Sequence, residues 1–334
     1  MNVQTDACRE RFNGLVGSVL PMKRTDFTFR ATDGKEIQAY KWEKEADDIK
    51  GVVQIAHGMA EHALRYEPFA AFLTAHGYIV YANDHRGHGR TYKNESEKGY
   101  LADEDGFELA TDDLRKLSEH IRNEHPNLPI FLLGHSFGSF LTRRYIQKFD
   151  PDLKGVLISG TGGDPKLLGK IGLAVAKMQK KLKGPKKESP LMDKLIFGSY
   201  NKRISPVRTK FDFLTRDENA VDAYIADENC GFVCKTSFYV DLLEGLLNIH
   251  EQNEAEKTPK DLPIFIFSGN EDPVGDYGKG VQSVYEQLLE LGCTKVSIKL
   301  YEGGRHEMLN EINKEEVYED ILNWLDTIVK GESV

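Results

Sequence analysis

The hydrophobic pattern after residue 24 switches repeatedly between two periods. Short apolar runs such as GVVQIA (51–56) and YIVYA (78–82) predict buried strands, and Phe69 and Leu73 lie between them at helical spacing. Segments with helical periodicity separate similar runs at 130–133, 156–159, 264–268 and 296–300. Strands that are apolar on both faces and alternate with helices are typical of a mainly parallel sheet covered on both sides. We therefore expect an α/β fold.

Two stretches depart from this alternation. Residues 25–30 and 36–42 flank Asp33-Gly34, a tight-turn dipeptide, and predict a β-hairpin. From residue 160 to about 231, strand signals are absent and Lys, Gly and Pro are frequent, which predicts a mostly helical insertion. The expected organisation is an N-terminal segment without an assigned role, the first part of an α/β core, a helical cap and the second part of the core: residues 1–24, 25–159, 160–235 and 236–334.

Composition excludes several classes of protein. The 334 residues include 53 acidic and 44 basic side chains, and a net charge of −9 disfavours nucleic acid as a partner. No apolar run approaches the roughly 18 residues of a membrane span. The apolar patch at 15–20 is shorter than a signal-peptide core, so no signal peptide is expected.

The number of cysteines bears on the cellular location of the protein. Four cysteines are too few for a disulfide scaffold in a chain of this length, which predicts free thiols and a cytoplasmic protein. Cys230 and Cys234 are closely spaced, but no second Cys/His pair completes four zinc ligands. We therefore expect neither a metal nor a cofactor.

The sequence GHSFG (134–138) carries the sharpest chemical signal. It directly follows the predicted strand 130–133 and precedes a helical pattern, which is the context of a nucleophile elbow. The glycines leave room for a strained turn that lifts Ser136 out of the sheet. The helix that follows points free N–H groups at negative charge developing there. Ser136 is the predicted nucleophile.

A serine hydroxyl needs a base to accept its proton. Only two of the ten histidines lie after residue 135. His250 falls in an apparent helix and is expected to be solvated, whereas His306 follows the predicted strand 296–300. His306 is therefore the predicted base.

The acid is sought in the loop after the predicted strand 264–268. Asp272 is favoured because Pro273 fixes the chain after it, and Glu271 and Asp276 are local alternatives. The carboxyl ends of parallel strands share one edge of the sheet, so Ser136 can meet these distant loops there. The acid would hold the base in the correct tautomer and stabilise the imidazolium.

Acyl transfer also needs hydrogen-bond donors for the oxyanion. One predicted donor is the backbone N–H of Phe137, and the other is that of Met59 in the loop HGMAEH (57–62). Gly58 allows close backbone approach in this loop. Whether the side chains of His57 and His62 take part or only pack the loop stays open.

Five ordered motifs together resemble the α/β-hydrolases, and more narrowly the monoacylglycerol lipase and lysophospholipase branch, a family also linked to serine aminopeptidases. The motifs are HGMAEH (57–62), NDHRGHGR (83–90), GHSFGS (134–139), SGNEDPVG (268–275) and GGRHEMLNE (303–311). The resemblance covers about residues 25–329 and implies a Ser-His-Asp esterase with a helical cap over an acyl tunnel. By motif position it implies Ser136 as nucleophile, Asp272 and His306 as its partners, and Met59 and Phe137 as oxyanion donors.

Two residues depart from this branch. Phe137 stands where the branch commonly has Met and would make a bulkier, stiffer pocket floor, and Met59 is larger than the small residue often found there. The preferred acyl-chain length therefore stays open. In the loop 83–90, four side chains have the chemistry of a metal or second catalytic cluster, whereas the resemblance implies a structural role: Asp84, His85, Arg86 and His88.

The first half of the cap is strongly basic. Residues 166–187 include eight lysines and no acidic residue. A predicted helix there has an apolar stripe of Leu167, Ile171, Val175, Met178 and Leu182. Such a helix either contacts anionic lipid surfaces transiently or packs its stripe on the core and leaves the lysines solvated. In the second half, the candidate pocket residues are Phe213, Leu214 and Tyr224.

The leading hypothesis is a serine hydrolase of carboxylic esters, such as monoacylglycerols, lysophospholipids or small acyl esters. One alternative is an aminopeptidase, which would need acidic groups near the cap to bind a free amine: Glu218, Asp227 or Glu228. A second alternative is a non-catalytic binding protein built on the same fold.

Overall fold

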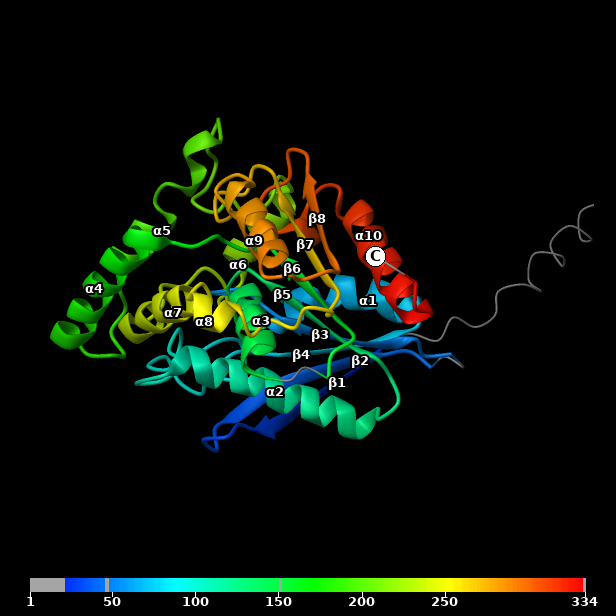
Figure 1. Cartoon of the computed structure of the whole chain (residues 1–334). Coiled ribbons are helices and arrows are strands. Elements are labelled where there is room, and N and C mark those ends of the chain that lie inside the picture. Colours follow the sequence, from blue (N-terminus) through cyan, green and yellow to red (C-terminus); the bar gives the residue numbers. More distant parts are fainter. Residues whose placement is uncertain (1–21, 46–47, 150–151, 333–334) are drawn as a thin grey trace, which may run out of the picture.

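A central β-sheet organises the computed structural model of the chain, which describes residues 22–45, 48–149 and 152–332 (Figure 1). Its eight strands lie in the order β1-β2-β4-β3-β5-β6-β7-β8. The pairs β1–β2 and β2–β4 are antiparallel, and all other neighbours are parallel. The strands are β1 Lys23–Arg30, β2 Glu36–Glu43, β3 Gly51–Ala56, β4 Tyr78–Asn83, β5 Ile130–His135, β6 Gly155–Ser159, β7 Ile264–Gly269 and β8 Val296–Tyr301. The expected hairpin and mainly parallel sheet are confirmed.

Helices cover both faces of the sheet. They are η1 Ala63–Tyr66, α1 Glu67–Ala75, α2 Gly106–Glu124, α3 Phe137–Lys148, α4 Lys166–Lys183, α5 Pro190–Phe197, η2 Tyr200–Arg203, α6 Glu218–Ala226, α7 Thr236–Asn248, α8 Gln252–Ala255, α9 Lys279–Glu290, η3 Met308–Asn310 and α10 Lys314–Lys330. Along β5, Phe131 and Leu133 face the cluster containing α1 and α10, and Leu132 faces the cluster containing α2, α3 and α9. This two-residue alternation explains why the strand is apolar throughout.

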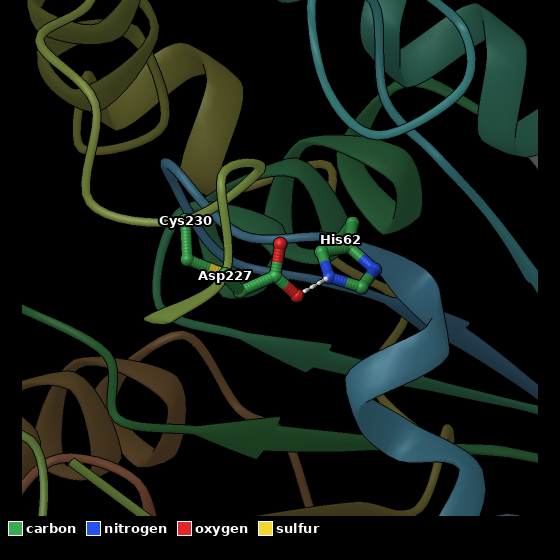
Figure 2. Close-up of side chains that lie close together, drawn as sticks. All are labelled: His62, Asp227 and Cys230. Carbon is green, nitrogen blue, oxygen red and sulfur yellow. Dashed lines mark hydrogen bonds and ion pairs between the residues drawn. The ribbon is translucent and has the colours of Figure 1, made fainter. Parts of the chain in front are cut away.

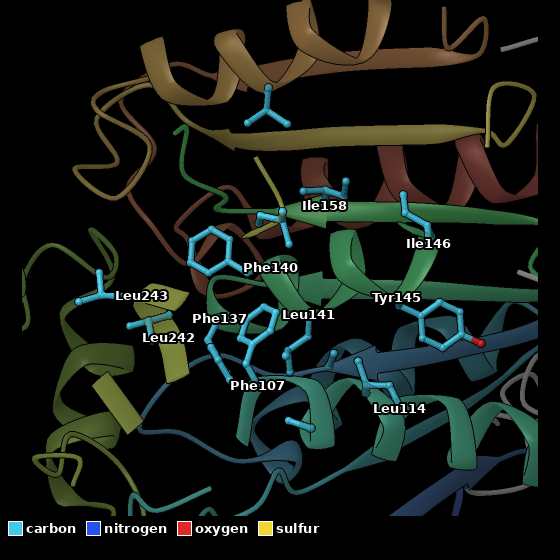
Figure 3. Packing of buried hydrophobic residues seen from close by; sticks show 14 of the residues in the cluster. Phe107, Leu114, Phe137, Phe140, Leu141, Tyr145, Ile146, Ile158, Leu242 and Leu243 are labelled. Carbon is cyan, nitrogen blue, oxygen red and sulfur yellow. The ribbon is translucent and has the colours of Figure 1, made fainter. Parts of the chain in front are cut away.

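The start of α3 is fixed by aromatic packing beneath it (Figure 3). The buried ring of Phe137 lies 6.0 Å from the ring of Phe107 and 5.2 Å from that of Phe238, measured between centroids. Aromatic pairs at such distances add stabilisation beyond their buried area. Closely packed aromatic side chains therefore support the turn between β5 and α3.

Helices α4 to α8 occupy the chain between β6 and β7. We call residues 160–235 the cap; these boundaries, like the role of residues 1–24, stay predictions, and residues 1–21 lie outside the described part of the chain. Helix α4 packs on α7 through Gly169, Gly172 and Ala176, whose small side chains allow close approach. The large side chains of the predicted stripe point the other way, and Leu167 and Leu182 are 69% and 75% exposed. Four of the five stripe side chains therefore do not pack on the core as that alternative expects, and only Val175 is half-buried against the core.

Candidate active site

The turn at Ser136 has the backbone of a nucleophile elbow. Ser136 has φ +52° and ψ −117°, a strained conformation for a residue with a side chain. A Cβ on Gly138 would overlap the carbonyl oxygen of Ala56, and one on Gly134 would overlap that of Gly138. Both glycines are therefore required for the close approach of α3 to the sheet.

A carboxylate and an imidazole meet at the end of the sheet beside this turn. Nδ1 of His306 lies 2.9 Å from Oδ2 of Asp272. Asp272 also accepts hydrogen bonds from the backbone N–H of Val274 and the hydroxyl of Ser268, both at 2.9 Å. The two alternative acids, Glu271 and Asp276, are exposed. Asp272 is thus the carboxylate that orients His306.

Asp272 and His306 each shift the pKa of the other. Burial favours the neutral carboxyl of Asp272, but the charge and hydrogen bond of His306 outweigh it and lower the pKa of Asp272 below its usual value. Burial likewise opposes charge on His306, yet Asp272 raises the pKa of this imidazole above its usual value. The ring is therefore well suited to accept a proton.

A cavity of about 290 Å³ brings the predicted residues together. Ser136 and His306 line it along with Met59 and Phe137, whereas Asp272 is buried behind His306. The three candidate pocket residues from the cap also line it: Phe213, Leu214 and Tyr224. Further apolar lining comes from Phe140, Ile196, Phe197, Phe211 and Phe232. The cavity is suited to an apolar chain held next to the serine.

Two backbone donors in this cavity are free. The N–H of Gly58 donates to Glu61, and that of Ala60 donates to Nε2 of His88. Between them, the N–H of Met59 has no acceptor among the described residues, and neither has that of Phe137. An unpaired N–H beside a reacting carbonyl is what an oxyanion hole supplies.

An ion network that the sequence did not reveal holds the two loops around the cavity. Arg65 donates to both carboxylate oxygens of Glu307 at 2.7 Å and to Glu61 at 2.6 Å. Arg65 lowers the pKa of Glu307 to about 2 against the opposing effect of burial. Because Glu61 holds the N–H of Gly58 and Glu307 follows His306, one guanidinium positions both loops. The partners are 242 residues apart, and no spacing signal links them.

Neutral histidines from the loops after β3 and β4 form a hydrogen-bonded network. Nε2 of His57 accepts from the backbone N–H of His85 at 2.9 Å, and Nδ1 of His88 donates to the carbonyl oxygen of Arg86 at 2.8 Å. Burial lowers the pKa of His85 to about 3 and that of His88 to about 4. Arg86 pairs with Asp113 at 2.6 Å. These contacts support the structural role for this loop over a second catalytic cluster.

Two further histidines, His250 and His62, each contact a side chain far away in the sequence. His250 lies just after α7 and receives a hydrogen bond from the guanidinium of Arg143 at 3.2 Å, so its prediction as a solvated helical residue is wrong. His62 contacts Asp227 of the cap at 2.8 Å.

Comparison with known proteins assigns the family. The model of the family described as "Serine aminopeptidase, S33" matches residues 47–313. The chain belongs to this family. Proteins similar to it include a monoacylglycerol lipase of Mycolicibacterium smegmatis, 28% identical over 90% of this chain and 97% of that protein, and the human monoglyceride lipase, 26% identical over 88% of each.

Solved structures agree with the fold of the chain. A carboxyl esterase from Bacillus coagulans, in complex with glycerol, superposes with a TM-score of 0.85 at 28% identity and covers 92% of this chain and all of that one. The monoglyceride lipase of Saccharomyces cerevisiae has a TM-score of 0.71 at 21% identity. The α/β-hydrolase fold expected from the motifs is confirmed. In the described ranges, no helix of this family member is both long and apolar enough to cross a membrane.

Proposed function

We propose that the protein is a serine hydrolase that cleaves carboxylic esters, with Ser136, His306 and Asp272 as its catalytic triad. The observation that carries the proposal is the Asp272–His306 pair beside an apolar cavity whose wall includes Ser136 and two free N–H groups. The family assignment and the lipase and esterase relatives support the same reaction.

The chemistry follows from these positions. Nε2 of His306 accepts the hydroxyl proton as Ser136 attacks the ester carbonyl carbon. The N–H groups of Met59 and Phe137 stabilise the oxyanion, each contributing about 3 kcal/mol in such reactions. His306 then protonates the leaving alcohol, and water activated by the same ring releases the carboxylic acid. Asp272 stabilises the imidazolium in both halves of the cycle.

Monoacylglycerols are the substrate class that we favour, with lysophospholipids and small acyl esters as the other candidates. The apolar lining from Phe213, Leu214 and Tyr224 supports a fatty acyl chain in the cavity. The names of the relatives support the glycerol ester. The three acids considered for binding a free amine in an aminopeptidase are Glu218, Asp227 and Glu228. None of them lines the cavity, although Asp193 of the cap does.

A substrate panel tests this choice. We expect hydrolysis of monoacylglycerols and of p-nitrophenyl esters, with a maximum at one chain length because the cavity is bounded. We expect no comparable turnover of aminoacyl p-nitroanilides. Faster cleavage of the anilides would favour the peptidase, and no turnover of any substrate would favour a binding protein. The cytoplasmic location expected from the sequence stays a prediction.

We also propose that α4 contacts anionic lipid surfaces during the reaction. Four large apolar side chains of its stripe are exposed, and Leu168 beside them is 80% exposed. Lysines flank this surface, and Lys170, Lys181 and Lys183 are exposed and have no ion-pair partner among the described residues. Apolar side chains that enter the interface and lysines that attract anionic headgroups act together in such contacts.

Vesicle binding tests this contact. Replacing Lys170, Lys181 and Lys183 by Gln is expected to weaken binding to anionic vesicles at low salt by roughly 100-fold, since each lysine near the surface contributes about 1 kcal/mol. The control is Lys295→Gln with Lys330→Gln, which removes two positive charges far from α4 and should leave binding nearly unchanged. Sedimentation with neutral and anionic vesicles measures both. Equal binding of the wild type to the two kinds of vesicle would contradict the proposal.

A further inference from the structure

A second cluster of reactive side chains lies outside the catalytic cavity, where the cap meets the loop after β3 (Figure 2). His62 extends from that loop, and Asp227 and Cys230 extend toward it from the turn after α6. One ligand atom from each of the three side chains lies within 4.8 Å of the other two. The reaction proposed above uses none of them.

The turn itself presents two of these groups on one side. The backbone N–H of Cys230 donates to the carbonyl oxygen of Asp227 at 3.0 Å, which closes an Asp-x-x-Cys turn. Oδ1 of Asp227 accepts from the N–H of Asn229 at 2.8 Å, so its Oδ2 is left to face His62. Paired zinc ligands are commonly separated by two to four residues in such turns. A fixed carboxylate is also how proteins orient a metal site in advance.

The three groups have the chemistry of a zinc site. Imidazole nitrogen, carboxylate oxygen and thiolate sulfur are the ligands that Zn²⁺ takes in proteins, at about 2.0–2.3 Å. Tetrahedral coordination at those lengths puts ligand atoms about 3.3–3.8 Å apart, so the cluster needs only small side-chain rotations. Carboxylate and thiolate charges together would neutralise the ion. The positive charge of Arg65 nearby is already paired with Glu61 and Glu307.

The protonation of the sulfur is also consistent. Burial raises the pKa of the Cys230 thiol above its usual value, so the thiol is neutral without a metal. On binding, the S–H bond breaks, the proton leaves to solvent, and a metal–sulfur bond forms. His62 and Asp227 remain partly exposed, which leaves the ion a path from solvent.

We propose that His62, Asp227 and Cys230 form a binding site for Zn²⁺, with water as the fourth ligand. The site would join the cap to the loop that carries Met59. Two hydrogen bonds to the carbonyl oxygen of Ala60 already join these parts, from the N–H of Gly231 at 2.9 Å and from the hydroxyl of Tyr224 at 2.8 Å, and His62 contacts Asp227 at 2.8 Å. Zinc would replace the His62–Asp227 contact by bonds to all three ligands and restrain the cap where it closes the cavity.

Titration of the full-length, tag-free protein with Zn²⁺ and with Co²⁺ tests the site. We expect one ion per chain and, with Co²⁺, the charge-transfer absorption of a thiolate ligand. Cys230→Ser is expected to abolish that absorption and to weaken Zn²⁺ binding at least about tenfold. Zn²⁺ should raise the thermal midpoint of the wild type and not that of the variant.

The controls separate this site from other thiols. Cys293→Ser, remote from the cluster, and Cys8→Ser should both bind as the wild type does. If Cys230→Ser does not fold, Asp227→Asn and His62→Gln test the same ligands, and each should also weaken binding at least about tenfold. Wild-type affinity in the ligand variants, or a charge-transfer band that survives Cys230→Ser, would overturn the proposal. These readouts do not depend on turnover and therefore stand apart from the proposed esterase.

Discussion

Ser136→Ala is expected to lower kcat on p-nitrophenyl butyrate by about 10⁶-fold, the loss typical when the nucleophile of a triad is removed. The reason is that no other hydroxyl stands on the turn between β5 and α3 with a strained backbone facing the cavity. Steady-state kinetics and labelling by a fluorophosphonate probe measure the effect. Circular dichroism should be unchanged, because the hydroxyl of Ser136 donates no hydrogen bond to any described group.

The matched control lies in the same motif. Ser139→Ala removes a hydroxyl that only donates to the backbone oxygen of Ser136 at 2.6 Å. We expect it to retain activity within about tenfold, since it loses one neutral hydrogen bond worth about 1 kcal/mol. Labelling that persists in Ser136→Ala and disappears in Ser139→Ala would refute the assignment of the nucleophile.

Asp272→Asn is expected to lower kcat by about 10⁴-fold, because an amide favours the wrong tautomer of the base. The pH profile gives a second measure. Only neutral His306 accepts the proton, and Asp272 raises its pKa, so wild-type kcat/KM should fall with decreasing pH from above the usual imidazole pKa. Loss of the negative charge removes this increase, and the acidic limb of the variant should move to lower pH.

The neighbouring acid provides the comparison. Glu271→Gln changes an exposed side chain one residue away, and its rate and profile should match those of the wild type. A large loss in Glu271→Gln together with a nearly normal Asp272→Asn would show that the orienting acid has been misassigned.

The sequence could predict the parts of the site that depend on local chain geometry. A strand, two glycines and a helix surround Ser136 within a few residues, and the loops of Asp272 and His306 each follow a strand whose end must lie at the same sheet edge. The parallel topology therefore predicts that those three residues lie close together. It does not predict the Arg65 network, because Arg65 and Glu307 are 242 residues apart and no periodic pattern links them.

The hydrophobic pattern also did not predict which face of α4 is buried. Hydrophobic periodicity points to the face with large apolar side chains, and that face is exposed. The buried face carries Gly169, Gly172 and Ala176, which contribute little to the hydrophobic signal yet permit close contact with α7. The solvated position expected for His250 failed similarly, because Arg143 reaches it from α3, 107 residues earlier.

The position of Arg65 has a consequence for redesign of this enzyme. Its guanidinium links Glu61, which accepts from the N–H of Gly58 in the proposed oxyanion loop, to Glu307, which lies beside the proposed base His306. If only one of these two loops were replaced by that of a relative, one of the buried charges could lose its partner. An unpaired buried charge costs several kcal/mol of stability. Grafts at residues 57–62 and 303–311 therefore need to be exchanged as a matched set, together with the arginine between them.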